Sequence, residues 1–251
     1  GALIDSGDYQ LALELALRDG RLDELRQRQA AARSEGRLYG IGFAAIVEPS
    51  VSNMGYITTV LPREQRAKAG PKNGAIAAAT VSIDPLGGLT AAIASAPAGQ
   101  GHRPVCAQLA ADVFGVDPDE VSVNTEFDTA KDAWSVAAGN YSSRFAGAVA
   151  GTLHLACRRL RDKLARIAAA QFGCEPDQIV FSGGKVYPKD APERGQPFGR
   201  LAASPHWAPG LLTEGEPVGL RETAFWSPPQ LTAPDEDDRV NTSAAYGFAF
   251  D

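Results

Sequence analysis

The feature that most constrains this chain is the loop Gly99-Gln100-Gly101-His102, called the first glycine loop below. It follows a predicted strand, Leu89 to Ala96, and opens a predicted helix, Arg103 to Phe114. The second glycine loop, Gly139 to Arg144, opens another long predicted helix. Free backbone N–H groups and the positive dipole end at a helix start favour negative charge. Two such loops predict an anionic ligand with more than one charged group.

Both loops consist of small or donor-rich residues. Glycine permits close approach of the backbone, and the Gln100 amide can both donate and accept. A guanidinium such as that of Arg144 binds phosphate through two parallel hydrogen bonds. Each loop alone is better explained as an ordinary turn, with Ser142 or Ser143 as a helix cap in the second, so only the pair carries the prediction. The candidate ligand-binding residues are Gly99, Gln100, Gly101, His102, Gly139, Asn140, Ser142, Ser143 and Arg144.

Several familiar catalytic and nucleotide motifs are missing from the sequence. It has no G-x-G-x-x-G dinucleotide fingerprint, no G-x-x-x-x-G-K-[ST] phosphate loop and no G-x-S-x-G nucleophile elbow. Glu48, Glu126 and Asp128 are isolated carboxylates without an evident acid/base partner. We therefore predict loops that bind a ligand and no catalytic residue within this chain.

Two His–Cys pairs have the spacing of one helix face. They are His102 with Cys106, and His154 with Cys157. Together they would supply four zinc ligands, but they lie on separate predicted elements that nothing brings together. Buried thiols explain them better, and no metal site is predicted from side chains of this chain.

Composition narrows the class of protein. A length of 251 residues allows one large or two small domains, and the net charge of −6 argues against a nucleic-acid-binding protein. The sequence contains no apolar run as long as a membrane span, and no signal segment at its start. The three cysteines are few and far apart, as in proteins of the reducing cytoplasm. We expect a cytoplasmic protein with a small-molecule substrate and neither nucleic-acid nor membrane partners.

The predicted elements indicate an α+β fold, in which mixed sheets of hairpins pack on two long helices and a Pro-rich irregular arm follows. One hairpin joins Gly74–Ile83 to Leu89–Ala96, and another joins Ile179–Phe181 to Lys185–Tyr187. The second long helix is predicted from Ser143 to Ala170.

Three parts follow along the chain. They are a helical lead-in at 1–36, an α+β core at 37–187, and a Pro/Gly-rich arm with a truncated strand at 188–251. The lead-in is predicted as a helix pair divided at Gly20, and a strand at Tyr39–Val47 is expected to end at Glu48 and Pro49. The final strand stops without a turn and the chain starts without methionine. We interpret the chain as a piece of a longer polypeptide.

Five segments, in this order, resemble the molybdenum-cofactor-binding large subunit of the molybdenum hydroxylases, the family of xanthine dehydrogenase, aldehyde oxidase and carbon monoxide dehydrogenase. They are Leu38–Phe43, Glu48–Ser50, Gly99–His102, Asp117–Val121 and Gly139–Arg144. The resemblance implies a molybdopterin cofactor, in bacteria often with a cytosine dinucleotide tail. It further implies hydroxylation of a carbon centre, with electrons leaving through iron–sulfur clusters and FAD on partner subunits or domains.

The resemblance also assigns the loops. The first glycine loop would contact the pterin and diphosphate, and Ser142, Ser143 and Arg144 the diphosphate or nucleotide end. Ser142 stands where the family commonly has glycine. The family's substrate-pocket loop and catalytic glutamate are expected outside this chain, so we expect the chain alone to be inactive. A catalytically dead scaffold or interaction protein, and a module for free nucleotides, are the alternatives on the same fold.

Overall fold

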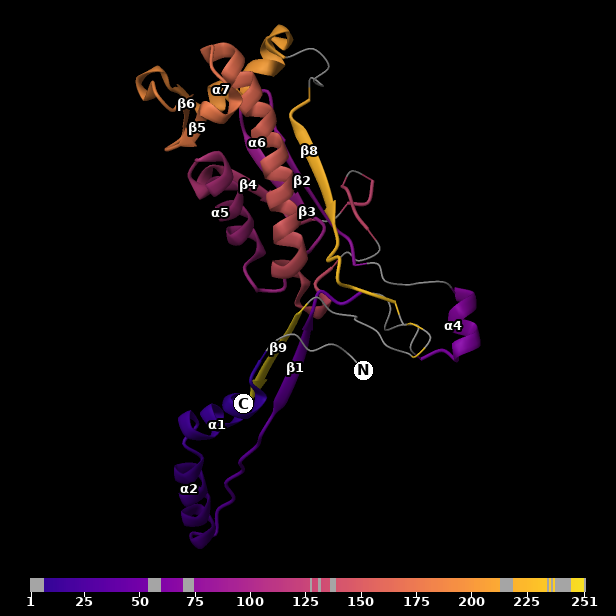
Figure 1. The fold of residues 1–251 in the computed structure, drawn as a ribbon. Helices are drawn as coiled ribbons and strands as arrows, with labels where there is room; N and C mark the ends of the chain where they lie inside the picture. Colours follow the sequence, from indigo (N-terminus) through magenta and orange to yellow (C-terminus); the bar gives the residue numbers. More distant parts are fainter. Residues whose placement is uncertain are drawn as a thin grey trace.

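A four-stranded mixed sheet covered by two helices forms the body of the molecule (Figure 1). The computed structural model describes residues 7–53, 60–69, 75–126, 128–130, 132–135, 139–212, 219–233, 235, 237 and 245–250. The strand order is β4-β3-β2-β8. The strands are β2 (Ala77–Ile83), β3 (Leu89–Ile93), β4 (Val121–Asn124) and β8 (Arg221–Trp226).

The predicted hairpin in this sheet is confirmed. β2 and β3 pair antiparallel with Ile83 opposite Leu89. The carboxylate of Asp84 accepts hydrogen bonds from the backbone N–H groups of Leu86 and Gly88, at 2.8 and 2.9 Å. These bonds hold the pKa of Asp84 below its ordinary value, because they stabilise the charged carboxylate. The turn therefore fixes the register of the two central strands.

Helix α5 (His102–Phe114) crosses from β3 to the parallel strand β4, as a βαβ unit requires. The short 3₁₀ turn η1 (Pro118–Glu120) leads into β4, and Asp117 caps it in a capping box with Glu120. α5 packs beside α6 (Gly151–Phe172) over the sheet (Figure 1).

The long helix α6 buries an apolar stripe that includes Leu153, Leu160, Leu164 and Ile167. Its predicted start at Ser143 is replaced by a 3₁₀ turn, η2 (Tyr141–Ser143), and a π-helix, η3 (Phe145–Ala150). The regular α-helix therefore begins only at Gly151, because the residues between the second glycine loop and Gly151 form the tighter and wider turns of η2 and η3.

A small sheet of order β5-β6-β7 closes one end of the body. Its elements, with the neighbouring turns and helix, are η4 (Pro176–Gln178), β5 (Ile179–Ser182), β6 (Lys185–Pro188), η5 (Pro192–Arg194), β7 (Gln196–Pro197), α7 (Phe198–Trp207) and η6 (Pro209–Leu211). The β5–β6 hairpin is confirmed. The rings of Phe114 and Phe198, 5.7 Å apart, join α5 to α7.

Residues 188–251 differ from the predicted irregular arm. α7 contributes buried residues to the core, and β8 pairs antiparallel with β2 as an edge strand of the main sheet. Prolines hid both elements, since Pro205 lies inside α7 and Pro/Gly-rich flanks surround β8. Tertiary pairing outweighs this local signal. The three-part division of the chain stays a prediction.

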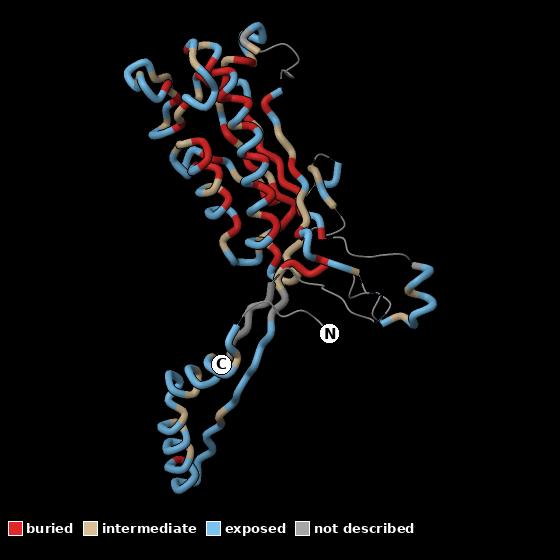
Figure 2. The backbone as a smooth tube through the Cα atoms, in the orientation of Figure 1, coloured by how far each residue is buried: buried red, intermediate tan, exposed pale blue. Residues whose placement is uncertain are grey.

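A slender extension projects from the body (Figures 1 and 2). Helix α1 (Tyr9–Asp19) contacts β9 (Ala245–Phe250) of a two-stranded ribbon with β1 (Ala45–Ser50), and α2 (Leu22–Ser34) follows α1 towards the tip (Figure 1). A break between the helices at Gly20 is confirmed, and Asp8 caps α1. Among the described residues of α1 and α2, only Ala32 is buried.

Strand β1 corrects two expectations. It begins at Ala45 instead of Tyr39, and it continues through Glu48 and Pro49, which pair with Gly247 and Tyr246. Proline is tolerated in a strand that has an unpaired edge, as either strand of a two-stranded ribbon does. The partner β9 lies far away in sequence, so local signals could not define β1. The predicted strand residues 241–244 and Asp251 lie outside the described residues.

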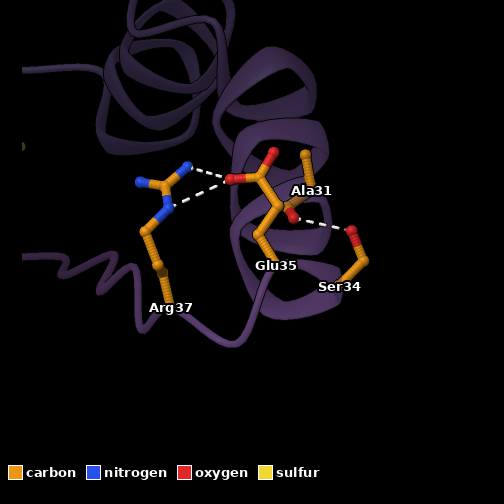
Figure 3. Close-up of polar contacts among 4 residues, drawn as sticks. All are labelled: Ala31, Ser34, Glu35 and Arg37. Carbon is orange, nitrogen blue, oxygen red and sulfur yellow. Dashed lines mark hydrogen bonds and ion pairs between the residues drawn. The ribbon is translucent and has the colours of Figure 1, made fainter.

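The tip of the extension is held by local polar contacts (Figure 3). Arg37 forms an ion pair with Glu35. The Ser34 hydroxyl donates to the Ala31 carbonyl at 2.7 Å in the last turn of α2. These exposed contacts contribute little to stability.

A separate short helix, α4 (Arg63–Ala69), lies on the other side of the molecule (Figure 1).

Alanine substitutions at two glycines with positive φ, Gly115 and Gly173, test how closely the end of α5 approaches the small sheet. A Cβ at Gly115 would lie 2.4 Å from the backbone of Phe181, whereas a Cβ at Gly173 meets nothing within 4 Å. We expect Gly173→Ala to cost about 1 kcal/mol for its backbone conformation alone. Gly115→Ala should cost about 1–3 kcal/mol more, because the neighbouring backbone must shift. Urea unfolding measures both, and equal losses would contradict the close approach.

Candidate functional site

The two glycine loops lie together at the end of β3. The backbone N–H of Gly139 donates to the Ala94 carbonyl at 3.2 Å, and the Ser95 hydroxyl is 3.3 Å from the Gly139 carbonyl. The Asn140 amide donates to the Ala96 carbonyl and accepts from the Ser95 hydroxyl. Two segments far apart in sequence are thus joined by at least four polar contacts.

The first glycine loop presents its backbone to solvent. Gly99 and Gly101 have φ of +104° and +79°, a conformation that glycine adopts without strain. Gln100 is exposed, and its side-chain oxygen accepts from the backbone N–H of Ala98. No side chain caps the start of α5. The first N–H groups of this helix therefore have no side-chain acceptor and suit an anion.

His102, the last residue of the first glycine loop, is fully buried. Its Nδ1 lies 3.2 Å from the Ser95 carbonyl oxygen, and its ring stacks on Phe145 with centroids 3.8 Å apart and planes 10° apart. The carbonyl is an acceptor, so Nδ1 carries the proton and donates. Nε2 has no hydrogen-bond partner within the part of the chain that the structure describes. His102 thus ties the helix start to the segment that follows the second loop.

The second glycine loop contains two left-handed residues that are not glycine. Ser142 has φ +52° and Ser143 has φ +43°. Such residues each cost of the order of 1–3 kcal/mol and persist only where the surroundings enforce them. Neither serine caps a helix, since the turn that begins here has no side-chain cap. Consecutive N–H groups in turns of this kind form concave anion-binding sites.

Arg144, the last residue of the second loop, is buried, with 2% of its surface exposed. Its Nη2 donates to the carbonyls of Ala75 and Ile76 at 3.4 and 3.3 Å, and its guanidinium carbon lies 5.5 Å from the centroid of the Tyr141 ring. Nε and Nη1 have no hydrogen-bond partner among the described residues.

The described residues include no carboxylate that forms an ion pair with Arg144. A buried charge without a counter-ion is costly, and two buried donor groups without acceptors add to that cost. An anion at the second loop would compensate both. The residues present therefore fit a ligand that carries phosphate groups.

Sequence reasoning missed Ser95, Tyr141 and Phe145 as parts of this site. Ser95 is fully buried and uses its carbonyl for His102 and its hydroxyl for the second loop. A lone serine at the end of an apolar strand was the available signal. Nothing in the local sequence around Phe145 indicates that its ring stacks on His102.

Other hollows lie away from the loops. A groove of about 330 Å³ between α1, α2 and residues 41–45 is lined by apolar side chains and glycines. A cleft of about 310 Å³ beside α5 and α6 includes Asp112, His154, Arg158 and Arg161. The described residues contain no cluster of three or more His, Cys, Asp or Glu that could hold a metal ion. None of their helices is long and apolar enough to cross a membrane.

A family model for the molybdopterin cofactor-binding domain matches residues 15–251. The chain therefore belongs to this family, and the resemblance to the molybdenum hydroxylase large subunit is confirmed.

The chain is 28% identical to the nicotine 6-hydroxylase large subunit of Paenarthrobacter nicotinovorans, over 80% of this chain and 23% of that protein. It is 27% identical to the carbon monoxide dehydrogenase large chain of Hydrogenophaga pseudoflava, over 92% of this chain and 27% of that protein. It matches the structure of quinoline 2-oxidoreductase from Pseudomonas putida 86 with a TM-score of 0.65 and 25% identity, over 97% of this chain and 28% of that one. The chain thus spans about a quarter of the length of each relative.

The buried thiols provide a test of the packing beneath the site. Burial raises the pKa of Cys106 to about 11 and that of Cys157 to about 12, whereas Cys174 is only partly buried. We expect a disulfide reagent at neutral pH to label Cys174 alone in the folded chain, and all three thiols in denaturant. Labelling of Cys106 or Cys157 at the rate of Cys174 would contradict the closed α5–α6 seam.

The same two thiols give stability a pH dependence. The folded state keeps their protons at pH values where unfolded thiols, with an ordinary pKa of 9.0, lose them. Their contribution is therefore complete below pH 9.0 and is lost as the pH rises towards the raised values. Unfolding free energies measured above and below pH 9.0 should show this fall, and a Cys106→Ala/Cys157→Ala variant should show a shallower one.

Proposed function

We propose that this chain supplies the cofactor-binding loops of the molybdenum subunit of an oxidoreductase that hydroxylates a carbon centre of a small molecule. One observation carries the proposal: hydrogen bonds join the second glycine loop to Ser95 and Ala96, just before the first glycine loop, and the buried Arg144 of the second loop forms no ion pair with a described carboxylate. The family membership and the names of the relatives support it.

Each loop has a part in the proposed binding. Gly99, Gln100, Gly101 and His102 would contact the pterin and the diphosphate, through the uncapped start of α5 and the Gln100 amide. Gly139, Asn140, Ser142, Ser143 and Arg144 would hold the diphosphate or the nucleotide end. In this arrangement Asn140 fixes the spacing of the loops, and Arg144 supplies positive charge from beneath.

The cofactor, when bound, supplies the redox chemistry of the hydroxylation. The residues of this chain bind and orient it, and we assign no catalytic residue among them. We propose that the cofactor has a cytosine dinucleotide tail, and that iron–sulfur clusters and FAD on partner subunits or domains accept the electrons. The chain alone is inactive in this proposal, and the whole protein acts in the cytoplasm, where free cysteines such as Cys106 and Cys157 persist.

Titration of the chain with CDP tests the proposal directly. CDP carries the diphosphate and cytidine without the pterin, so we expect weak, millimolar binding that stabilises the fold. At about ten times its Kd, a ligand raises the free energy of unfolding by about 1.4 kcal/mol. Cytidine, which lacks phosphate, should have no effect. Thermal or urea unfolding provides the measurement.

Arg144→Met sharpens the test. Removal of a buried charge should leave the free energy of unfolding of the ligand-free chain within about 1 kcal/mol of wild type, or raise it. The stabilisation by CDP should disappear. The matched control is Arg159→Met, since Arg159 is exposed and donates to the Thr223 carbonyl at 3.3 Å. This control should retain the full response to CDP.

The outcomes separate the candidate functions. Weak binding that depends on the diphosphate and on Arg144 supports the proposal. Micromolar binding of several free nucleotides favours a nucleotide-binding module. No binding of CDP, together with a fold that Arg144→Met leaves intact, contradicts the assignment of the loops and favours the scaffold alternative.

A further inference from the structure

Val51 has a backbone conformation that a valine rarely adopts. It follows β1 directly, with φ +58°, and 1% of its surface is exposed. A β-branched residue in the left-handed region is an outlier, because its branched Cβ crowds the backbone. Such conformations persist only where the surroundings over-determine them, and they cluster at functional sites.

Contacts with the second glycine loop surround Val51. Its backbone N–H donates to the Ser142 carbonyl at 2.8 Å. Its side chain faces Gly147 in the π-helix η3, where an added Cβ would lie only 2.6 Å from Val51 Cγ2. Val51 therefore touches the chain on both sides of Arg144: its hydrogen bond meets the loop before Arg144, and its methyl group meets the π-helix after it.

The segment behind Val51 is also fixed. Ser52 and Asn53 are buried, and the Asn53 amide donates to the Thr232 carbonyl at 2.9 Å. Val51 can thus hold the loop because its own segment is anchored elsewhere in the fold. In the part of the chain that the structure describes, three of the four non-glycine residues with positive φ are Val51, Ser142 and Ser143. The strain is concentrated where β1 meets the second loop.

We propose that Val51 is a positioning residue for the second glycine loop. Its N–H and its contact with Gly147 hold Ser142 and Ser143 in the left-handed conformation that presents the loop to the anionic end of the cofactor. This inference rests on the proposed function. It assigns a role to β1, which also pairs with β9, and so connects the projecting ribbon to the loop.

A double-mutant cycle at the contact tests the inference, with the Kd for CDP as the readout. Val51→Ala removes the methyl groups that touch Gly147, and Gly147→Ala adds a Cβ where Val51 leaves no room. Each single change should weaken CDP binding by about tenfold or more, because a small displacement misaligns the donors. The double variant removes the Val51 Cγ2 methyl, with its Cγ1 partner, and places the new Gly147→Ala methyl where Cγ2 stood in the way, so it should restore the affinity to within about twofold of wild type.

Val186→Ala is the matched control, because Val186 is fully buried in the small sheet. It should lower the melting temperature while leaving the Kd for CDP unchanged. A merely structural role for Val51 would give the same pattern as this control.

The results distinguish two failures. If wild type binds CDP and Val51→Ala binds it with equal affinity, the inference is overturned and the proposed function stands. If both singles lose affinity and the double variant is no better than either, direct contact between Val51 and Gly147 is not the cause, and the inference also fails. If wild type does not bind CDP, the proposed function fails and this inference fails with it.

Discussion

The paired hydrogen bonds between Asn140 and the segment that follows β3 set the geometry of the candidate site. The Asn140 amide is hydrogen-bonded to the Ser95 hydroxyl and the Ala96 carbonyl, so the second glycine loop is held against the segment that leads into the first. Ser95 in turn accepts from buried His102, whose ring stacks on Phe145 just beyond the second loop. A closed circuit of polar and aromatic contacts therefore connects both loops to both helices. Each loop is ordinary alone, and together they form a rigid pair of helix starts.

Beneath this circuit the protein holds features that are unfavourable by themselves. Arg144 is buried with two nitrogens that lack partners among the described residues, and Ser142, Ser143 and Val51 have left-handed backbones. Apolar packing along α6 and the main sheet offsets the free-energy cost of these features. Their concentration at one place is typical of preorganised binding sites, where the ligand completes what the fold leaves unsatisfied.

Local signals predicted much of the fold. The β2–β3 hairpin and the helix α5 after the first glycine loop both lie where the sequence predicts them. The misses share one physical cause. β1 passes through Pro49 because β9 pairs with it, and β8 joins the main sheet beside β2 although prolines and glycines surround it. Pairing between segments distant in sequence overrides local propensity. No short window of sequence contains the information about such pairing.

The sequence by itself determined the residue types at the site, two sets of small and donor-rich residues before two helices, and the family to which they belong. Only the tertiary structure decided how these residues are used. In the tertiary structure His102 and Arg144 are buried. Asn140 forms a hydrogen bond with the segment before the first loop, and Val51, at the end of β1, packs against Gly147. Spacing along the chain defines which groups can donate hydrogen bonds. Burial and pairing in three dimensions decide which of those groups are already satisfied and which remain for a ligand.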